Sequence, residues 1–245
     1  MSHNCAFVSN KGTLITSDIL ESLRPSEPID HYNGMKIYKN LENRRMGLSV
    51  DVGTGIGQDY SVFQVFDLNS LEQVAEFRDN QLNITDLTKR LISILRYLAD
   101  HGDEIIFSVE ANSVGQGVTQ LIRNANNNIF NEIEMISNNN KHDGIMTTSK
   151  TKIKGCTKFK DLIESKRMKI HSKELISELK FFVKSGVSFK AESGKTDDLT
   201  MGCVLMCLML EEMALYDEHV YDIMNSVDII GDIEEEDDAP LPFAF

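Results

Sequence analysis

Residues 46–68, MGLSVDVGTGIGQDYSVFQVFDL, contain two apolar segments of strand-like composition, joined by a short glycine-rich connection. Asp51 lies inside the first segment, immediately before the glycines. Burying an unpaired carboxylate costs free energy, so an acid in this position needs hydrogen-bond partners or a bound cation. We therefore treat Asp51 as a candidate site residue. The alternative is a core polar group whose hydrogen bonds are satisfied within the protein.

The glycines at positions 53, 55 and 57 fit a tight turn between two antiparallel strands. They lack the GxGxxG spacing of a dinucleotide site, and a strand rather than a helix follows them. Actin-like ATPases use a similar DxGTG turn to hold phosphates, but they need two such domains, and this chain of 245 residues has one copy. The sequence also contains no GxxxxGK[ST] phosphate-binding loop.

The order of apolar patterns along the chain predicts the fold class. Three hairpin-linked strands are expected at residues 48–52, 60–68 and 74–78, followed by a helix that Thr85 caps and Gly102 ends. The later elements are a strand at 105–109, helices at 114–125 and 157–166, a short strand at 168–171, a helix from Ser172, a strand at 186–191 and a helix from Asp197. This order predicts an α/β fold of the ribonuclease H-like (RuvC/integrase) type, with a mixed central sheet flanked by helices.

Two further acidic positions follow strands or begin a helix in this prediction. Glu110 ends the fourth strand, where open α/β sheets usually build their sites, and the pair Asp197-Asp198 begins a helix that is apolar nearly all round. With Asp51, these carboxylates are hard oxygen donors that suit Mg²⁺ or Mn²⁺. Each has a simpler interpretation, since Glu110 can merely end a strand and the aspartate pair can merely complement the helix dipole.

At these positions the sequence resembles the C-terminal nuclease domain of the large terminase subunit, the DNA-packaging protein of tailed, myovirus-type bacteriophages. The resemblance implies metal-binding catalytic acids at Asp51, Glu110 and Asp198, with Asp59 and Asp197 as further acids around them. It also implies two Mg²⁺ or Mn²⁺ ions and cleavage of concatemeric double-stranded DNA with low sequence specificity. The matching motifs are VDVGTGIGQDYS at 50–61, VEANSVGQGV at 109–118, TKIKGCTKFKDLIE at 151–164 and SGVSFKAESGKTDDLTMGCVL at 185–205.

The same resemblance implies that the full-length protein carries a separate ATPase motor, acts with a portal and a small terminase subunit, and is located in the host cytoplasm. We accordingly expect residues 1–45 to be an N-terminal arm or interdomain remnant, 46–230 the nuclease domain, and 231–245 an acidic, disordered tail. No apolar run approaches the ~20 residues needed to span a bilayer. The four cysteines lack metal-site spacing and are typical of a reducing compartment.

Charge is distributed unevenly along this acidic chain, whose net charge is −13. Residues 141–195 contain 14 basic and 6 acidic side chains, whereas residues 196–245 contain 14 acidic and no basic ones. A local basic surface is sufficient to attract a polyanion, so the basic segment is a candidate DNA path. Its alternative is a solvated lysine-rich helix face. The acidic end of the chain either competes with DNA or only increases solubility. The predicted DNA-binding residues are Lys150, Lys152, Lys154, Lys158 and Lys160.

Two other functions remain compatible with the same acids and fold. A Holliday-junction resolvase would share the three carboxylates but would need a dimer interface. A catalytically silent packaging module would keep the fold without the activity.

Overall fold

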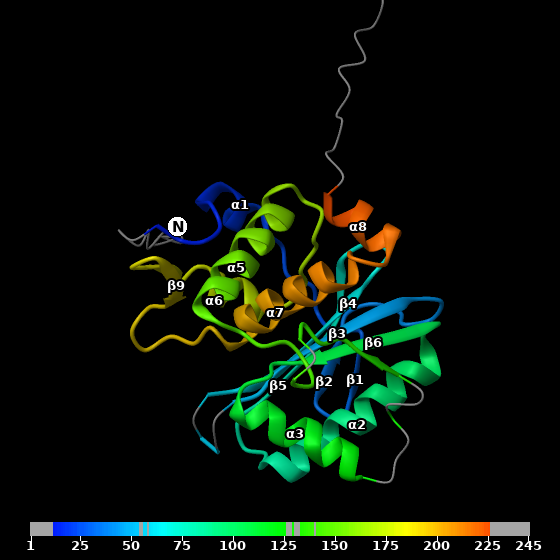
Figure 1. Cartoon of the computed structure of the whole chain (residues 1–245). Coiled ribbons are helices and arrows are strands. Elements are labelled where there is room, and N and C mark those ends of the chain that lie inside the picture. Colours follow the sequence, from blue (N-terminus) through cyan, green and yellow to red (C-terminus); the bar gives the residue numbers. More distant parts are fainter. Residues whose placement is uncertain are drawn as a thin grey trace, which may run out of the picture.

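The computed structural model describes residues 12–53, 56–57, 59–125, 129, 133–139 and 141–225. A seven-stranded mixed sheet lies at its centre, in the order β1-β2-β5-β4-β3-β6-β7 (Figure 1). β3 is parallel to β6 and β6 to β7, and the other neighbouring pairs are antiparallel. The strands are β1 (Asp30–Tyr32), β2 (Met35–Ile37), β3 (Arg45–Asp51), β4 (Ser61–Asp67), β5 (Glu72–Asp79), β6 (Glu104–Val109) and β7 (Glu134–Met135).

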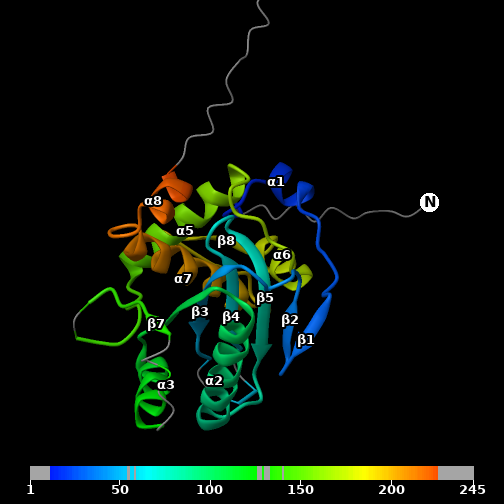
Figure 2. The same cartoon turned by 90° about the vertical axis from the view of Figure 1, so that its right-hand side faces the viewer.

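Helices cover both faces of the sheet, which confirms the predicted mixed α/β architecture (Figures 1 and 2). One face carries α5 (Ser149–Glu164), α6 (Lys173–Leu179) and α7 (Asp198–Met213), and the other carries α2 (Ile84–His101) and α3 (Ser113–Asn124). The remaining elements are α1 (Ser17–Ser22), α8 (Glu218–Asn225) and the separate hairpin of β8 (Phe182–Ser185) and β9 (Ser188–Ala191). None of the described helices is long and apolar enough to span a bilayer.

Alternation along β3 determines how closely α7 packs on the sheet. Leu48 and Val50 are buried in the core formed with α2 and α3, so Gly47 and Ser49, which alternate with them along the strand, face α7. A Cβ at Gly47 would lie 2.9 Å from a methionine side chain of α7. The Ser49 hydroxyl donates a hydrogen bond of 2.7 Å to the Gly202 carbonyl of α7. The small side chains of β3 therefore allow α7 to lie directly on the strand.

The α7 face of the sheet also buries a carboxylate, Glu76 of β5, which is only 2% exposed. Its oxygens accept hydrogen bonds from Ser172 Oγ (2.9 Å), Gln64 Nε2 (3.2 Å) and Gln73 Nε2 (3.3 Å). Burial nevertheless raises the pKa of Glu76 above its ordinary value. Because the hydroxyl partner is the N-cap of α6, this polar cluster connects the sheet to the start of that helix.

Two helix starts differ from the sequence prediction. The cap expected at Thr85 is wrong, because Asn83 is the N-cap of α2 and its side chain accepts a backbone hydrogen bond from the first turn. The helix expected at 157–166 begins earlier as α5, where Thr148 and Thr151 exchange hydrogen bonds in a capping box. Side-chain hydrogen bonds to the backbone decide both starts, and the apolar pattern does not report them.

The N-terminal region is more integrated than the predicted arm. Residues 30–37 form β1 and β2, which extend the sheet from β5, and Leu14 and Ile15 are fully buried against the α5–α7 side. The sheet therefore extends across the boundary expected at residue 46. Residues 168–171 join no strand of the described sheets, and Lys169 forms only a single bridge with Glu72. The tail predicted at 231–245 lies outside the described residues.

Candidate metal centre

Two of the predicted site acids lie at the same edge of the sheet. Asp51 is the last residue of β3, and Glu110 directly follows β6. The Glu110 backbone N–H donates to the Val50 carbonyl at 2.8 Å, so the parallel ladder continues up to the acids. Asp51 is two residues from Ser49 and therefore shares its α7-facing side. The sequence prediction that open sheets place sites at carboxyl strand ends fits this position.

The third acid reaches this edge from α7. Asp198 is the first residue of the helix and lies one turn before Gly202, the residue whose carbonyl binds Ser49 of β3. The helix is buried nearly all round, so its first turn is fixed against the sheet. The negative charge of Asp198 contributes to the raised pKa of Asp51. Asp51, Glu110 and Asp198 are therefore brought together from two strands and a helix N-terminus.

The surroundings of Asp51 disfavour its charged form. Burial raises the pKa of this side chain well above its ordinary value, and the charge of Glu110 and a hydrogen bond with its carboxyl raise it further. The charges of Asp198 and Asp197 act in the same direction. Clustered acids of this kind favour either a shared proton or a bound cation. All donors are carboxylate oxygens, so a hard divalent cation fits the set.

Asp198 has a different environment, because a cation and a backbone donor face it. Burial raises the pKa of Asp198, as do the charges of Asp197 and Asp59, whereas Arg78 and the backbone N–H of Tyr60 lower it. The Arg78 Nη2 atom lies 4.0 Å from the Asp198 Oδ2 atom. Asp198 is therefore partly neutralised within the protein, and Asp51 is not.

The two surrounding acids are placed differently. Asp197 precedes α7, and its Oδ2 accepts a hydrogen bond of 3.1 Å from the backbone N–H of Ala191 at the end of β9. Asp59 is exposed in the connection between β3 and β4. Its carbonyl oxygen packs so closely on Gly53 that a Cβ there would lie 2.2 Å away. The contact of Asp197 with β9 supports Asp198 as the acid of the pair that faces Asp51, and the assignment of all five acids stays a prediction.

The carboxylates are not arranged as a finished coordination sphere. Across the described part of the chain, no group of three or more His, Cys, Asp or Glu side chains has the geometry of a metal site. Glu110 Oε2 accepts a hydrogen bond of 2.7 Å from Asn112 Nδ2, and Asn112 also caps α3. Glu110 and Asp198 are instead engaged by Asn112 and Arg78, so binding an ion would require the acid side chains to reorient.

Asn112 and Arg78 were not among the site residues predicted from sequence. Asn112 lies two residues before the predicted helix at 114–125, close to the position where asparagine often caps a helix, so the sequence contains a signal for its capping role. Its hydrogen bond to Glu110, two residues earlier, has no such signal. Arg78 approaches Asp198 across 120 positions of sequence, and no local pattern reports such a contact.

The predicted DNA-binding lysines all belong to α5; Lys152 lies over the Phe182 ring, 6.0 Å from its centre, and three others form ion pairs or hydrogen bonds with the protein. Lys154 pairs with Glu211 of α7 at 3.0 Å and Lys160 with Glu164 at 3.5 Å. Lys158 donates to the Met224 carbonyl at the end of α8. Lys154 and Lys158 lie one turn apart on one side of α5, whereas Lys152 is about 200° around the helix from Lys154, so the five lysines do not form a single face. The set on α5 is Lys150, Lys152, Lys154, Lys158 and Lys160.

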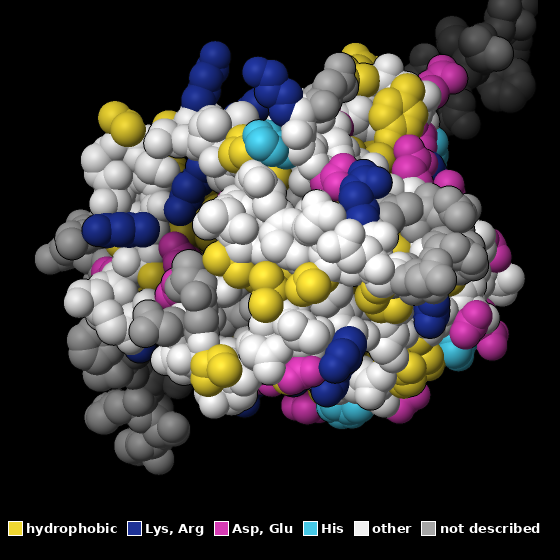
Figure 3. Space-filling model, turned by 60° about the horizontal axis from the view of Figure 1, so that its bottom comes forward, with side chains coloured by type: hydrophobic (Ala, Val, Ile, Leu, Met, Phe, Trp, Pro, Cys, Tyr) yellow, Lys and Arg dark blue, Asp and Glu magenta, His cyan; other side chains and the backbone are white. Residues whose placement is uncertain are grey.

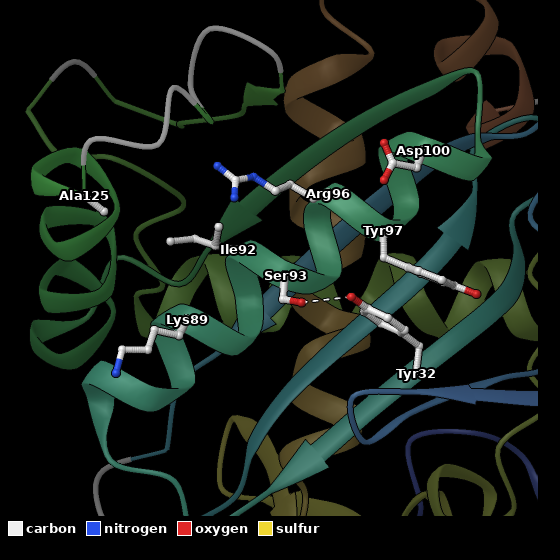
Figure 4. A pocket seen from close by; sticks show the side chains of 8 residues that line it. All are labelled: Tyr32, Lys89, Ile92, Ser93, Arg96, Tyr97, Asp100 and Ala125. Carbon is white, nitrogen blue, oxygen red and sulfur yellow. Dashed lines mark hydrogen bonds between the residues drawn. The ribbon is translucent and has the colours of Figure 1, made fainter.

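A pocket of about 400 Å³ lies on the outer side of α2, on the opposite side of the sheet from α7 (Figure 4). The rings of Tyr32 and Tyr97 stack there at 3.8 Å, and the Tyr32 hydroxyl is 3.0 Å from Ser93 Oγ. None of the predicted site acids or lysines lines this pocket. Its lining residues are Tyr32, Lys89, Ile92, Ser93, Arg96, Tyr97, Asp100 and Ala125.

Comparisons with known proteins agree with this architecture. The model of the terminase ribonuclease H-like domain family matches residues 48–210. The large terminase nuclease from thermophilic phage G20c with bound magnesium superimposes with a TM-score of 0.63 at 16% identity, covering 82% of this chain and 98% of that one. The large terminase nuclease domain of Thermus phage P74-26 gives a TM-score of 0.58 at 17% identity, covering 79% and 93%.

At these identities the solved structures establish the fold, and the family model establishes the relationship, because its match includes most of the chain. The ribonuclease H-like fold and the resemblance to large terminases predicted from sequence are thereby confirmed. The chain belongs to the terminase family with a ribonuclease H-like domain.

Proposed function

We propose that this chain is the metal-dependent nuclease domain of a large terminase, which cuts concatemeric double-stranded viral DNA during genome packaging. The observation that supports this function best is the convergence of Asp51, Glu110 and Asp198 at one edge of the sheet. The G20c relative with bound magnesium has the same fold, and another structure of that nuclease contains cobalt. In the full-length protein the domain would act with an ATPase motor, a portal and a small terminase subunit.

The three acids would hold one or two Mg²⁺ or Mn²⁺ ions, with Asp59 and Asp197 in the surrounding acidic environment. Such ions, when bound, polarise a phosphodiester and supply a nucleophile at neutral pH. Asn112 would orient the Glu110 carboxylate through its hydrogen bond, and the Tyr60 backbone N–H would orient Asp198. The Asp197 contact with β9 would hold the start of α7 in register with the two strands.

The DNA would approach along the basic side of the molecule. In Figure 3, lysine and arginine side chains are more frequent on the left and acidic ones on the right. Figure 3 is turned from Figure 1 about the horizontal axis, so left and right are the same in both views. β9 and α6 lie on the left in Figure 1 and therefore on the basic side. α5, with its lysines, contacts β9. Lysine contacts read phosphates and carry little sequence information, in agreement with low cleavage specificity.

Incubation of the purified protein with plasmid DNA and with a four-way junction, in Mg²⁺ or Mn²⁺ and in EDTA, tests the proposed function. We expect nicked and linear plasmid in either metal and intact plasmid in EDTA. Cleavage restricted to the junction would indicate a resolvase, and a lack of cleavage of both substrates would indicate a silent packaging module.

Asp198→Asn should reduce plasmid cleavage much more than Asp197→Asn. The Asp197 carboxylate is bound to the Ala191 backbone, which leaves Asp198 as the acid of the pair that would face Asp51. Residues that only support metal ligands typically contribute ~10–100-fold, so the loss at Asp198 should exceed that range and the loss at Asp197 should not. Initial nicking rates at saturating Mg²⁺ measure both. The opposite ranking would make Asp197 the third ligand.

Asp51→Asn should stabilise the metal-free protein at neutral pH. Since the folded-state pKa of Asp51 is raised, its ionisation lowers stability as the pH rises through that pKa, and the variant removes this cost of ~1–3 kcal/mol. Thermal melting in EDTA should give a higher Tm for the variant, with the gap closing at acidic pH. Mg²⁺ should raise the Tm of the wild type and leave the variant unchanged. Equal responses to Mg²⁺ would argue against Asp51 as a ligand.

Replacing Lys150 and Lys152 together by alanine should weaken DNA binding without disturbing the fold. These two are chosen because Lys154 and Lys158 hold α7 and α8 through the contacts described above. Each lost phosphate contact should reduce the slope of log K against log salt concentration by about 0.9. Fluorescence anisotropy across a salt series measures this slope. Lys89→Ala on α2, on the other face of the sheet, is the control; an equal effect in both variants would place the DNA path elsewhere.

A further inference from the structure

Arg78 of β5 lies at the centre of a set of contacts around the start of α7. Its guanidinium carbon is 3.8 Å from the centre of the Tyr60 ring. Its Nη2 atom donates to Thr196 Oγ1 at 3.0 Å and pairs with Glu178 Oε1 at 3.4 Å. The same Nη2 atom is 4.0 Å from Asp198 Oδ2. One cation therefore links two carboxylates, one of which is a predicted metal ligand.

Glu178 holds Arg78 in place independently of Asp198. The Glu178 residue is buried, and its Oε2 accepts a hydrogen bond of 3.0 Å from the Thr200 backbone N–H in the first turn of α7. Its Oε1 also accepts a hydrogen bond from Thr196 at 2.9 Å. Arg78, Glu178 and the start of α7 are thus one connected unit that joins β5, α6 and α7.

The contact between Arg78 and Asp198 is the loosest of this set. Its 4.0 Å separation is longer than a hydrogen bond, whereas the contact of Arg78 with Thr196 has hydrogen-bond length. The Arg78 Nε atom is buried and has no hydrogen-bond partner within the described residues. The guanidinium therefore has contacts with Tyr60, Thr196 and Glu178 that do not depend on Asp198.

We propose that Arg78 is a positioning residue that holds Asp198 in the metal-free protein and competes with the divalent ion for its carboxylate. This inference rests on the proposed metal-dependent function. Asp198 lies among like charges, those of Asp51, Asp59 and Asp197, and without an opposing cation they would drive its side chain away from the site. Arg78 supplies that cation, and its charge opposes the approach of a second positive ion.

Mn²⁺ binding separates this role from a purely structural one, because the two predict opposite signs. Isothermal titration of the purified protein with Mn²⁺ should give a Kd about three- to tenfold lower for Arg78→Gln than for the wild type, since one positive charge is removed several ångströms from the ion. The plasmid nicking rate of the same variant should fall, because Asp198 is no longer oriented. A structural role alone would leave the Kd unchanged or raise it.

Arg78→Lys supplies the second part of the test. Lysine keeps the charge but lacks the planar guanidinium that stacks on Tyr60 and bonds two partners at once. The Mn²⁺ Kd of this variant should stay within about twofold of the wild type, while its nicking rate falls. The charge of residue 78 then sets the affinity and its shape sets the rate. A Kd of Arg78→Lys that matched that of Arg78→Gln would overturn the competition.

Arg44→Gln is the matched control, because the side chains of Arg44 and Arg78 are each 23% exposed and each pairs with an acid. Its partner, Asp67, ends β4, whereas Asp51 pairs with Val62 near the start of that strand. The control should leave the Mn²⁺ Kd unchanged.

If Arg78→Gln does not fold, the double variant Arg78→Gln/Glu178→Gln is used instead, because it does not leave the buried Glu178 carboxylate without its cation. The double variant should also bind Mn²⁺ more tightly than the wild type. An unchanged or higher Kd in the folded variant overturns the proposal. Failure of the wild type itself to bind Mn²⁺ would instead contradict the proposed function.

Discussion

The contact between α7 and β3 depends on small residues on both elements, Gly47 and Ser49 on the strand and Gly202 on the helix. A Cβ at Gly202 would lie 3.0 Å from a glutamine side chain of β4, so the helix backbone rests almost on the sheet. This close approach fixes where the first turn of α7 ends. As a result, Asp198 is held close enough to Asp51 for its charge to raise the pKa of that side chain. The site therefore depends on packing one helical turn away, at Gly202.

The same packing creates an electrostatic conflict that the protein only partly resolves. The largest influences on Asp51 are burial and the neighbouring acids Glu110, Asp198 and Asp197, and all of them raise its pKa. Asp198, by contrast, is stabilised by Arg78 and by the Tyr60 N–H, and Glu110 by Asn112. The uncompensated charge is thus concentrated on the strand, where a divalent ion would relieve it. Arg78 pairs with Asp198 and, within the described residues, forms no ion pair with Asp51, so the proposed effect of Arg78 on metal affinity would act through Asp198.

Sequence alone predicted the fold and the positions of the acids because both follow from local patterns. Asp51 interrupts an apolar strand and Glu110 ends another, so each stands out within a few residues. The contacts of Arg78 with Glu178 and Asp198 join distant segments, and periodicity carries no information about them. The pairing of β1 and β2 with β5 was missed for a related reason, since three-residue strands are too short to show alternation.

We propose that Asp51, Glu110 and Asp198 together bind a divalent metal. Crystals of the protein soaked in Mn²⁺ and measured for anomalous scattering test it directly, because manganese gives a signal that carbon, nitrogen and oxygen do not. We expect one or two anomalous peaks within coordination distance of the three carboxylates, with Asp198 turned away from Arg78. Peaks only at other acidic surfaces, or an Asp198 that keeps its contact with Arg78 beside a fully bound ion, would contradict it.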